Sequence, residues 1–124
     1  MEGNKSIVVL GSLNMDLVMT TPRIPAAGET MHGTSFESHP GGKGLNQAVA
    51  CQRLLRGTGW KTYMIGRVGD DEFCQRLKSS LDTEGVDITE VKTATGKPSG
   101  VALILVTEPS LQSNITGRTT FRTE

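Results

Sequence analysis

The sequence has few aromatic residues and no excess of charge of either sign. Aromatic residues make up 4% of its 124 residues, and 13 Lys and Arg balance 13 Asp and Glu to a formal net charge of zero. Proteins that bind nucleic acids or membrane surfaces usually carry a basic excess or patch, and proteins that bind single-stranded nucleic acids stack the bases on aromatic rings. The composition therefore argues against a nucleic-acid partner and against a membrane surface.

Cysteine and long apolar runs are also scarce. Cys51 and Cys74 are the only cysteines, and both lie in helical patterns among apolar neighbours, which favours small buried residues over a disulfide or a metal site. No apolar run reaches the roughly 20 residues that cross a bilayer. The N-terminus passes straight into a strand pattern without the apolar core of a signal peptide. We therefore expect a cytoplasmic protein, with a nuclear location left open.

Short apolar strands alternate with amphipathic helices in the first part of the chain. Residues 7–10 and 62–65 are apolar runs typical of buried parallel strands. A helical pattern follows the glycines near residue 42 and another follows a turn that contains two aspartates. Asp70 or Asp71 is the expected N-cap of that second helix. This order of elements predicts an α/β fold built on a parallel sheet.

Two antiparallel excursions interrupt the alternation. Residues 17–20 form a short apolar strand that prolines stop, and residues 30–38 alternate loosely, as in an exposed strand. Residues 88–95 and 99–107 are predicted to pair as a hairpin across a turn of glycine, lysine and proline. The tail at 110–124 keeps no period, so it is expected to be irregular.

Three glycines surround one lysine at residues 41–44, where the first helix opens. The phosphate-binding P-loop needs Ser or Thr after the lysine, and Gly44 stands there instead. The glycine spacing of a dinucleotide-binding turn is also absent. What remains is exposed backbone N–H groups, the positive end of a helix, the Lys43 cation and the Asn46 amide. These features suit a polyhydroxylated ligand at least as well as a phosphate, and a simple turn before a helix is an equal alternative.

Asn14 and Asp16 follow the first predicted strand. Ligands of open α/β sheets bind beyond the carboxyl ends of strands, and residues two apart on an extended chain face the same side. A carboxylate that accepts hydrogen bonds from neighbouring hydroxyls is suited to a sugar. The alternative is that Asp16 only caps a turn.

Several segments in order resemble one family of enzymes. GSLNMD at 11–16, HPGGKGLNQAVA at 39–50, GRVGDDEFCQRLKSSL at 66–81 and SGVALILVT at 99–107 are similar to the ribokinase-like carbohydrate kinases, the PfkB-type family. The resemblance implies the N-terminal part of a three-layer α/β sandwich with a small antiparallel β lid. This part would span residues 1–109, with lid strands at about 17–40 and 89–107, before a divergent tail at 110–124.

The resemblance also implies an activity and a site. The activity is the ATP-dependent phosphorylation of D-ribose to ribose 5-phosphate, with ATP and magnesium as cofactors and a monovalent cation such as potassium as a further candidate. Ribose or a related pentose is the expected ligand, and the lid is the expected contact of a homodimer. No metal ligand is assigned. The residues expected to bind or frame the sugar are Asn14, Asp16, Gly41, Gly42, Lys43, Gly44 and Asn46.

One motif of the family is missing from this sequence. The glycine-alanine-glycine-aspartate segment, which carries the catalytic base in the family, does not occur in the 124 residues. We therefore interpret the chain as the sugar-binding and lid half of a truncated kinase, without a catalytic base or an ATP site and inactive alone. The alternative is a non-catalytic sugar-binding or dimerisation module.

Overall fold

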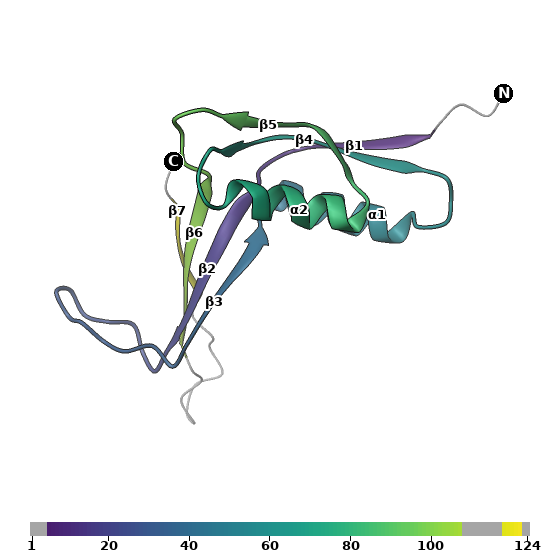
Figure 1. Ribbon diagram of the computed structural model, residues 1–124. Helices are drawn as coiled ribbons and strands as arrows, with labels where there is room; N and C mark the ends of the chain where they lie inside the picture. The colour runs from purple at the N-terminus through teal and green to yellow at the C-terminus, as the bar shows by residue number, and fades with distance from the viewer. Residues whose placement is uncertain (1–4, 108–117, 123–124) are drawn as a thin grey trace. The chain divides into compact units, whose positions relative to one another are not determined.

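The computed structural model describes residues 5–107 and 118–122, and the chain divides into two compact units (Figure 1). Unit 1 comprises residues 1–15 and 40–100, and unit 2 comprises residues 16–39 and 101–124. Each unit is built around its own sheet.

Unit 1 is a parallel sheet with two helices. β1 (Ser6–Leu10), β4 (Lys61–Gly69) and β5 (Asp87–Ala94) pair in parallel in the order β1-β4-β5. α1 (Lys43–Leu54) and α2 (Cys74–Glu84) contact each other and lie together on one side of this sheet (Figure 1). The expected α/β fold with a parallel sheet is confirmed.

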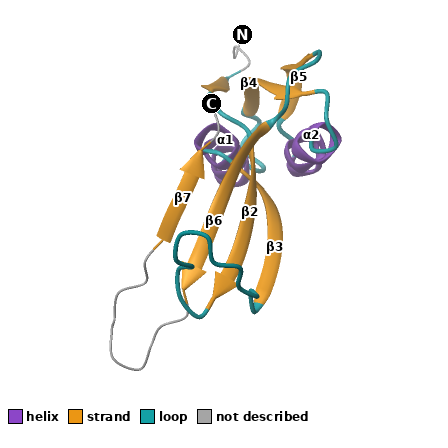
Figure 2. Ribbon diagram, turned by 90° about the vertical axis from the view of Figure 1, so that its left-hand side faces the viewer, coloured by secondary structure: helices purple, strands orange, loops and turns teal. Residues whose placement is uncertain are grey.

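The core of unit 1 lies between the sheet and the helices. Met64, Leu77 and Leu81 are 0% exposed there, because strand alternation and helical spacing turn these side chains toward each other. The alternate residues of each strand point to the other face of the sheet, away from the helices. Val8 and Leu10 of β1 lie on that face and are exposed. Figure 2 shows both helices, in cross-section, on the same side of β4 and β5.

Unit 2 contains most of a four-stranded sheet. Its strands are β2 (Asn14–Thr21), β3 (Ser35–Gly41), β6 (Gly100–Thr107) and β7 (Arg118–Arg122), in the order β3-β2-β6-β7. β6 and β7 are antiparallel. The sheet fits the expectation that antiparallel strands accompany the parallel core.

A loop between β2 and β3 is braced by one ion pair. The Arg23 guanidinium donates to both carboxylate oxygens of Glu29, at 2.8 and 2.5 Å, and the Ala26 N–H donates to the same carboxylate at 2.8 Å. These hydrogen bonds lower the pKa of the Glu29 carboxyl to about 2, and the bond from Arg23 has a larger effect than the bond from Ala26. The loop is therefore closed by its own side chains.

Two predictions from the sequence are wrong. The hairpin of residues 88–95 with 99–107 does not form, because β5 pairs with β4 in parallel whereas β6 lies between β2 and β7. α2 connects β4 to β5, and a helical crossover brings the second strand back parallel to the first. An irregular tail was expected, yet residues 118–122 form β7. Residues 108–117 and 123–124 lie outside the described part.

The predicted helix cap is also wrong. α2 begins at Cys74 with Phe73 at the N-cap position, and no side chain caps it. The carboxylates of Asp70 and Asp71 instead bind the connection between β5 and β6. Both cysteines are free; Cys74 is buried, as the sequence indicated, whereas Cys51 is only half-buried. Within residues 5–107 and 118–122, no helix is long and apolar enough to span a membrane.

Replacing Leu77 by Ala is expected to destabilise the chain strongly. Leu77 is 0% exposed in the core beneath α2, and such truncations cost about 2–5 kcal/mol through lost burial and a residual cavity. Leu54 on α1 is 83% exposed, so Leu54→Ala is the matched control and should change stability by less than about 0.5 kcal/mol. Urea unfolding followed by circular dichroism measures both, and equal losses would contradict this core.

Candidate functional site

The glycine turn at residues 41–44 packs directly on the link between β1 and β2. A Cβ atom at Gly44 would lie 2.6 Å from the carbonyl carbon of Gly11, and one at Gly42 would lie 2.7 Å from the carbonyl oxygen of Ser12. The Leu45 N–H donates to that same Ser12 oxygen at 3.1 Å. Glycine is needed at both positions because two backbones meet with no room for a side chain between them.

The start of α1 concentrates hydrogen-bond donors. Gly42 occupies the N-cap position with φ 95°, and no side chain caps the helix. The first N–H groups of a helix have no hydrogen-bond partner inside it. Here the carbonyl oxygen of Ser12 accepts a hydrogen bond from one of them, the N–H of Leu45. The side chains of Lys43 and Asn46 are exposed beside this turn. A positive helix end, an ammonium and an amide therefore lie close together.

Asn14 lies next to this turn. It is the first residue of β2 and is half-buried, and a Cβ atom at Gly42 would come within 3.0 Å of its backbone nitrogen. Gly41 ends β3 and is buried. The structure thus brings Asn14 together with the glycine turn.

Asp16 stands two residues further along β2 and begins unit 2. On an extended strand its side chain leaves the same side as that of Asn14. The sequence placed both residues at the end of the first strand, whereas they lie on the second strand, which begins at Asn14 rather than at residue 17. Their functional roles stay predictions.

Gly100 is a neighbour of Asn14 that sequence reasoning missed. A Cβ atom at Gly100 would fall closer than 3.0 Å to Oδ1 of Asn14. The Asn14 carboxamide therefore rests on the bare Cα of Gly100, where β6 begins. A glycine directly before an apolar strand was the available signal, but only the fold shows what lies against it.

Asp71 ties the turn after β4 to the start of β6. Its Oδ1 accepts from Ser99 Oγ at 2.7 Å and its Oδ2 accepts from the Ser99 N–H at 2.7 Å. Oδ1 also accepts from the Phe73 N–H at 3.2 Å. Burial would raise the pKa of the Asp71 carboxyl, but these hydrogen bonds outweigh it and the pKa is lowered. The carboxylate is therefore ionised at neutral pH.

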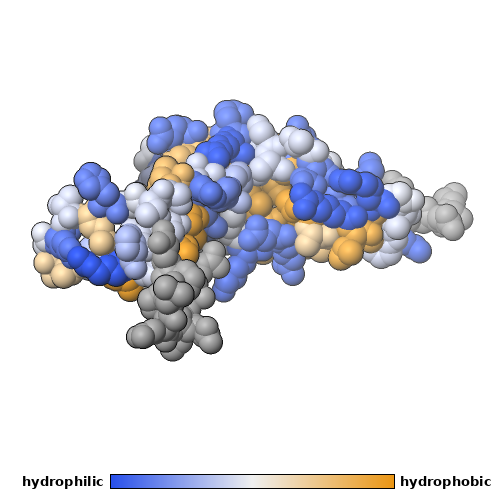
Figure 3. Space-filling view, turned by 90° about the horizontal axis from the view of Figure 1, so that it is seen from below, coloured by the Kyte–Doolittle hydropathy of each residue, from blue (hydrophilic) through white to orange (hydrophobic). Residues whose placement is uncertain are grey.

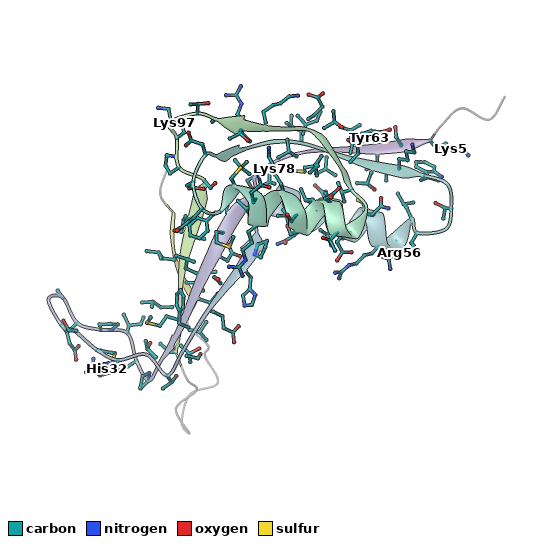
Figure 4. All side chains as sticks on the ribbon, in the orientation of Figure 1. Lys5, His32, Arg56, Tyr63, Lys78 and Lys97 are labelled. Atoms are coloured by element: carbon teal, nitrogen blue, oxygen red, sulfur yellow. The ribbon has the colours of Figure 1, made fainter. Side chains whose placement is uncertain are left out.

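Neighbouring side chains bind the same connection and hold α2 to the sheet. Asp70 Oδ2 accepts from the Gly96 N–H at 2.7 Å. Lys78 on α2 donates to Thr93 Oγ1 of β5 at 2.8 Å. Figure 4 labels Lys78 on the helix and Lys97 at the turn that follows β5. The end of this sheet is thus fastened by side chains as well as by strand pairing.

A groove runs along α1 and α2 on their outer side. Asn46 lines it together with apolar side chains, and the ion pair of Arg53 and Glu84 borders it. Figure 3 shows apolar surface between strongly polar groups on the face of the molecule that it views. Asn46 therefore lies at a hollow of the surface as well as at the start of α1.

The two histidines lie on unit 2. His32 stands in the loop between β2 and β3 (Figure 4), and His39 Nε2 on β3 is 2.8 Å from Glu37 Oε2. Among the described residues, no group of three or more His, Cys, Asp or Glu side chains is placed to hold a metal ion.

Comparison with known proteins identifies one protein family that matches this chain and several proteins similar to it in sequence. The family model described as pfkB family carbohydrate kinase matches residues 4–120. The ribokinase of Schizosaccharomyces pombe is 49% identical over 105 residues, which are 83% of this chain and 33% of that protein. The ribokinase of Bacillus subtilis is 44% identical over 104 residues, covering 84% of this chain and 34% of that protein. The chain thus spans about a third of the length of these relatives.

Solved structures show the same fold. The ribokinase of Giardia lamblia has a TM-score of 0.81 and 32% identity, covering 98% of this chain and 36% of that chain. The ribokinase of Arabidopsis thaliana, solved with ribose and ATP, has a TM-score of 0.79 and 29% identity over 98% of this chain and 36% of that chain. The architecture of units 1 and 2 is therefore that of a known carbohydrate kinase fold.

Replacing Gly44 by Ala is expected to disrupt the contact between the turn and the β1–β2 link. The added Cβ would lie 2.6–2.7 Å from three backbone atoms of Gly11 and Ser12, and backbone cannot give way as a flexible side chain can. Overpacking of this kind costs about 1–3 kcal/mol. Gln47→Ala, at an exposed position of the same helix, is the control. Thermal unfolding measures both, and a Gly44→Ala melting curve equal to the control would refute the contact.

The hydrogen bonds of Asp71 predict a pH dependence. A carboxyl with a lowered pKa in the folded state stabilises that state above its unfolded pKa of about 3.9, and the contribution is lost as the pH falls through the folded value. Asp71→Asn should therefore lower the unfolding free energy at pH 7 more than at pH 2.5. Urea titrations at the two pH values measure this, and an equal loss at both would contradict it.

Proposed function

This chain belongs to the pfkB family of carbohydrate kinases, and from that premise we propose that it forms the sugar-binding part of a kinase that phosphorylates ribose with ATP. Its relatives named above are ribokinases, and one of them was solved with ribose and ATP. The observation that carries the proposal is the packing of the glycine turn beside Asn14. This contact gathers donors and acceptors suited to a polyhydroxylated ligand at one place in unit 1.

Each polar group has a distinct part in this proposal. The Asn14 carboxamide can donate to one hydroxyl and accept from another, whereas the Asp16 carboxylate only accepts. A carboxylate accepting from two neighbouring hydroxyls forms the stronger, charge-assisted bonds. Lys43 and Asn46 add donors at the start of α1, while Gly41, Gly42 and Gly44 shape the turn. Ribose, with adjacent hydroxyls, fits such a set.

Phosphoryl transfer needs more than a sugar site. It requires a base for the attacking hydroxyl, donors for the developing phosphate charge, and ATP with magnesium. We assign none of these to the residues of this chain. Gly42 and Gly44 pack on the chain's own backbone rather than forming an open cradle for a phosphate. Magnesium and a monovalent cation such as potassium would belong to the complete kinase, and this chain would bind sugar without converting it.

The strands of unit 2 fit the proposed lid. Leu17, Met19, Phe36, Leu103 and Leu105 line an apolar hollow on β2, β3 and β6. Phe36 is 60% exposed and Leu103 is 47% exposed. Covering large exposed apolar side chains with another surface removes them from water, which is energetically favourable. This supports a lid formed by β2, β3 and β6 that also makes the contact of a homodimer.

Titration of the chain with D-ribose tests the proposal. Calorimetry should show saturable binding, which Asp16→Ala should weaken at least about 10-fold, because a hydrogen bond to a charged group contributes about 1.5–3 kcal/mol. Asp82→Asn, an exposed carboxylate near the end of α2, is the control and should bind as the unaltered chain does. A coupled assay should detect no ADP formation from ATP and ribose. Absence of saturable binding, or ADP formation proportional to the chain, would contradict the proposal.

A further inference from the structure

The connection between β5 and β6 is held against the end of β4. A Cβ atom at Gly69 would fall closer than 3.0 Å to backbone atoms of Lys97, Pro98 and Ser99. The Asp70 N–H donates to the Lys97 carbonyl oxygen at 3.1 Å. The segment that leads into β6 therefore lies directly on the backbone of the turn after β4.

Ser99 is the fixed point of this segment. It is 4% exposed, and its hydroxyl accepts from the Gly69 N–H at 2.9 Å while donating to Asp71 Oδ1 at 2.7 Å. Its own N–H donates to the other carboxylate oxygen of Asp71 at 2.7 Å. One carboxylate thus binds both the backbone and the side chain of Ser99, which leaves this residue little freedom to shift.

Gly100 links Ser99 to Asn14. It follows Ser99 directly and begins β6, and its bare Cα lies against Oδ1 of Asn14. A displacement of Ser99 therefore moves the surface on which the Asn14 carboxamide rests. All of these residues belong to unit 1, so the chain of contacts lies within one compact body.

We infer that Asp71 is a positioning residue for Asn14: through Ser99 it holds Gly100 beneath the Asn14 carboxamide and so sets the orientation in which that group meets the sugar. The sugar part of this inference rests on the proposed function. The orientation part stands on the contacts alone. A protein side chain that binds a ligand must be held to within a fraction of an ångström to bind it well. Neighbouring buried residues that contact this side chain commonly provide the restraint.

Asp70 provides a matched control in the same turn. Its carboxylate also accepts a backbone N–H from the β5–β6 connection, at Gly96, 2.7 Å away. The donor of that bond, Gly96, lies three residues before Ser99, so the bond does not restrain Ser99. Asp70→Asn therefore removes a charge and weakens a bond of the same turn without releasing Gly100.

The first measurement is the NMR signal of the Asn14 side-chain amide without sugar. Asp71→Asn and Ser99→Ala should shift or broaden this signal, whereas Asp70→Asn should leave it at its original position. A merely structural role for Asp71 would lower the urea midpoint without moving the Asn14 signal. An unchanged Asn14 signal in a folded Asp71→Asn chain would overturn the inference.

The second measurement is the affinity for D-ribose in the same variants. Asp71→Asn and Ser99→Ala should weaken binding about 10-fold, which corresponds to about 1.4 kcal/mol, and Asp70→Asn should leave it unchanged. Gly100→Ala keeps the Asp71–Ser99 bonds but displaces the carboxamide, so it should weaken binding equally. Unaltered affinity in Gly100→Ala, or equal losses in Asp70→Asn and Asp71→Asn, would refute the inference. If the unaltered chain binds no ribose, the proposed function fails, while the Asn14 signal still decides the positioning role.

Discussion

The close contact of two backbone segments, the glycine turn at 41–44 and the link that follows β1, is the constraint on which unit 1 depends. Gly44 and Gly11 meet with no side chain between them, so the start of α1 is fixed against the end of β1. α1 then packs on β1 and β4, and the buried side chains of helix and strands form the core of unit 1. The same contact leaves Asn14 beside the donors of the helix start.

A second restraint acts on the side chain of Asn14. The Asp71 carboxylate accepts two hydrogen bonds from Ser99, and the residue after Ser99 supports the Asn14 side chain. Asn14 therefore lies between a backbone contact formed by glycines and a support held by a carboxylate. Neither restraint uses the polar atoms of Lys43 or Asn46, which remain exposed for a ligand.

The chain passes between the two units three times, and each passage is adjacent to a residue of the candidate site. The first lies between residues 15 and 16, within the pair Asn14 and Asp16. The second lies between residues 39 and 40, just before Gly41, and the third follows Gly100. The proposed sugar-binding residues and their support are thus close in sequence to the points at which the chain leaves or re-enters unit 1.

The sequence by itself determined the alternation of strands and helices, the glycine turn and the polar pair Asn14 and Asp16, because local periodicity and turn chemistry report buried faces and element ends. It did not determine the partner of β5, the strand β7 or the role of Asp71. Those depend on residues far apart in the chain, such as Asp71 and Ser99, 28 positions apart. A strand pattern shows which face is buried but not which strand lies beside it, and a carboxylate before a helix can cap that helix or bind a distant loop. Only the tertiary structure decided between these, because it alone brings the competing donors within hydrogen-bonding distance.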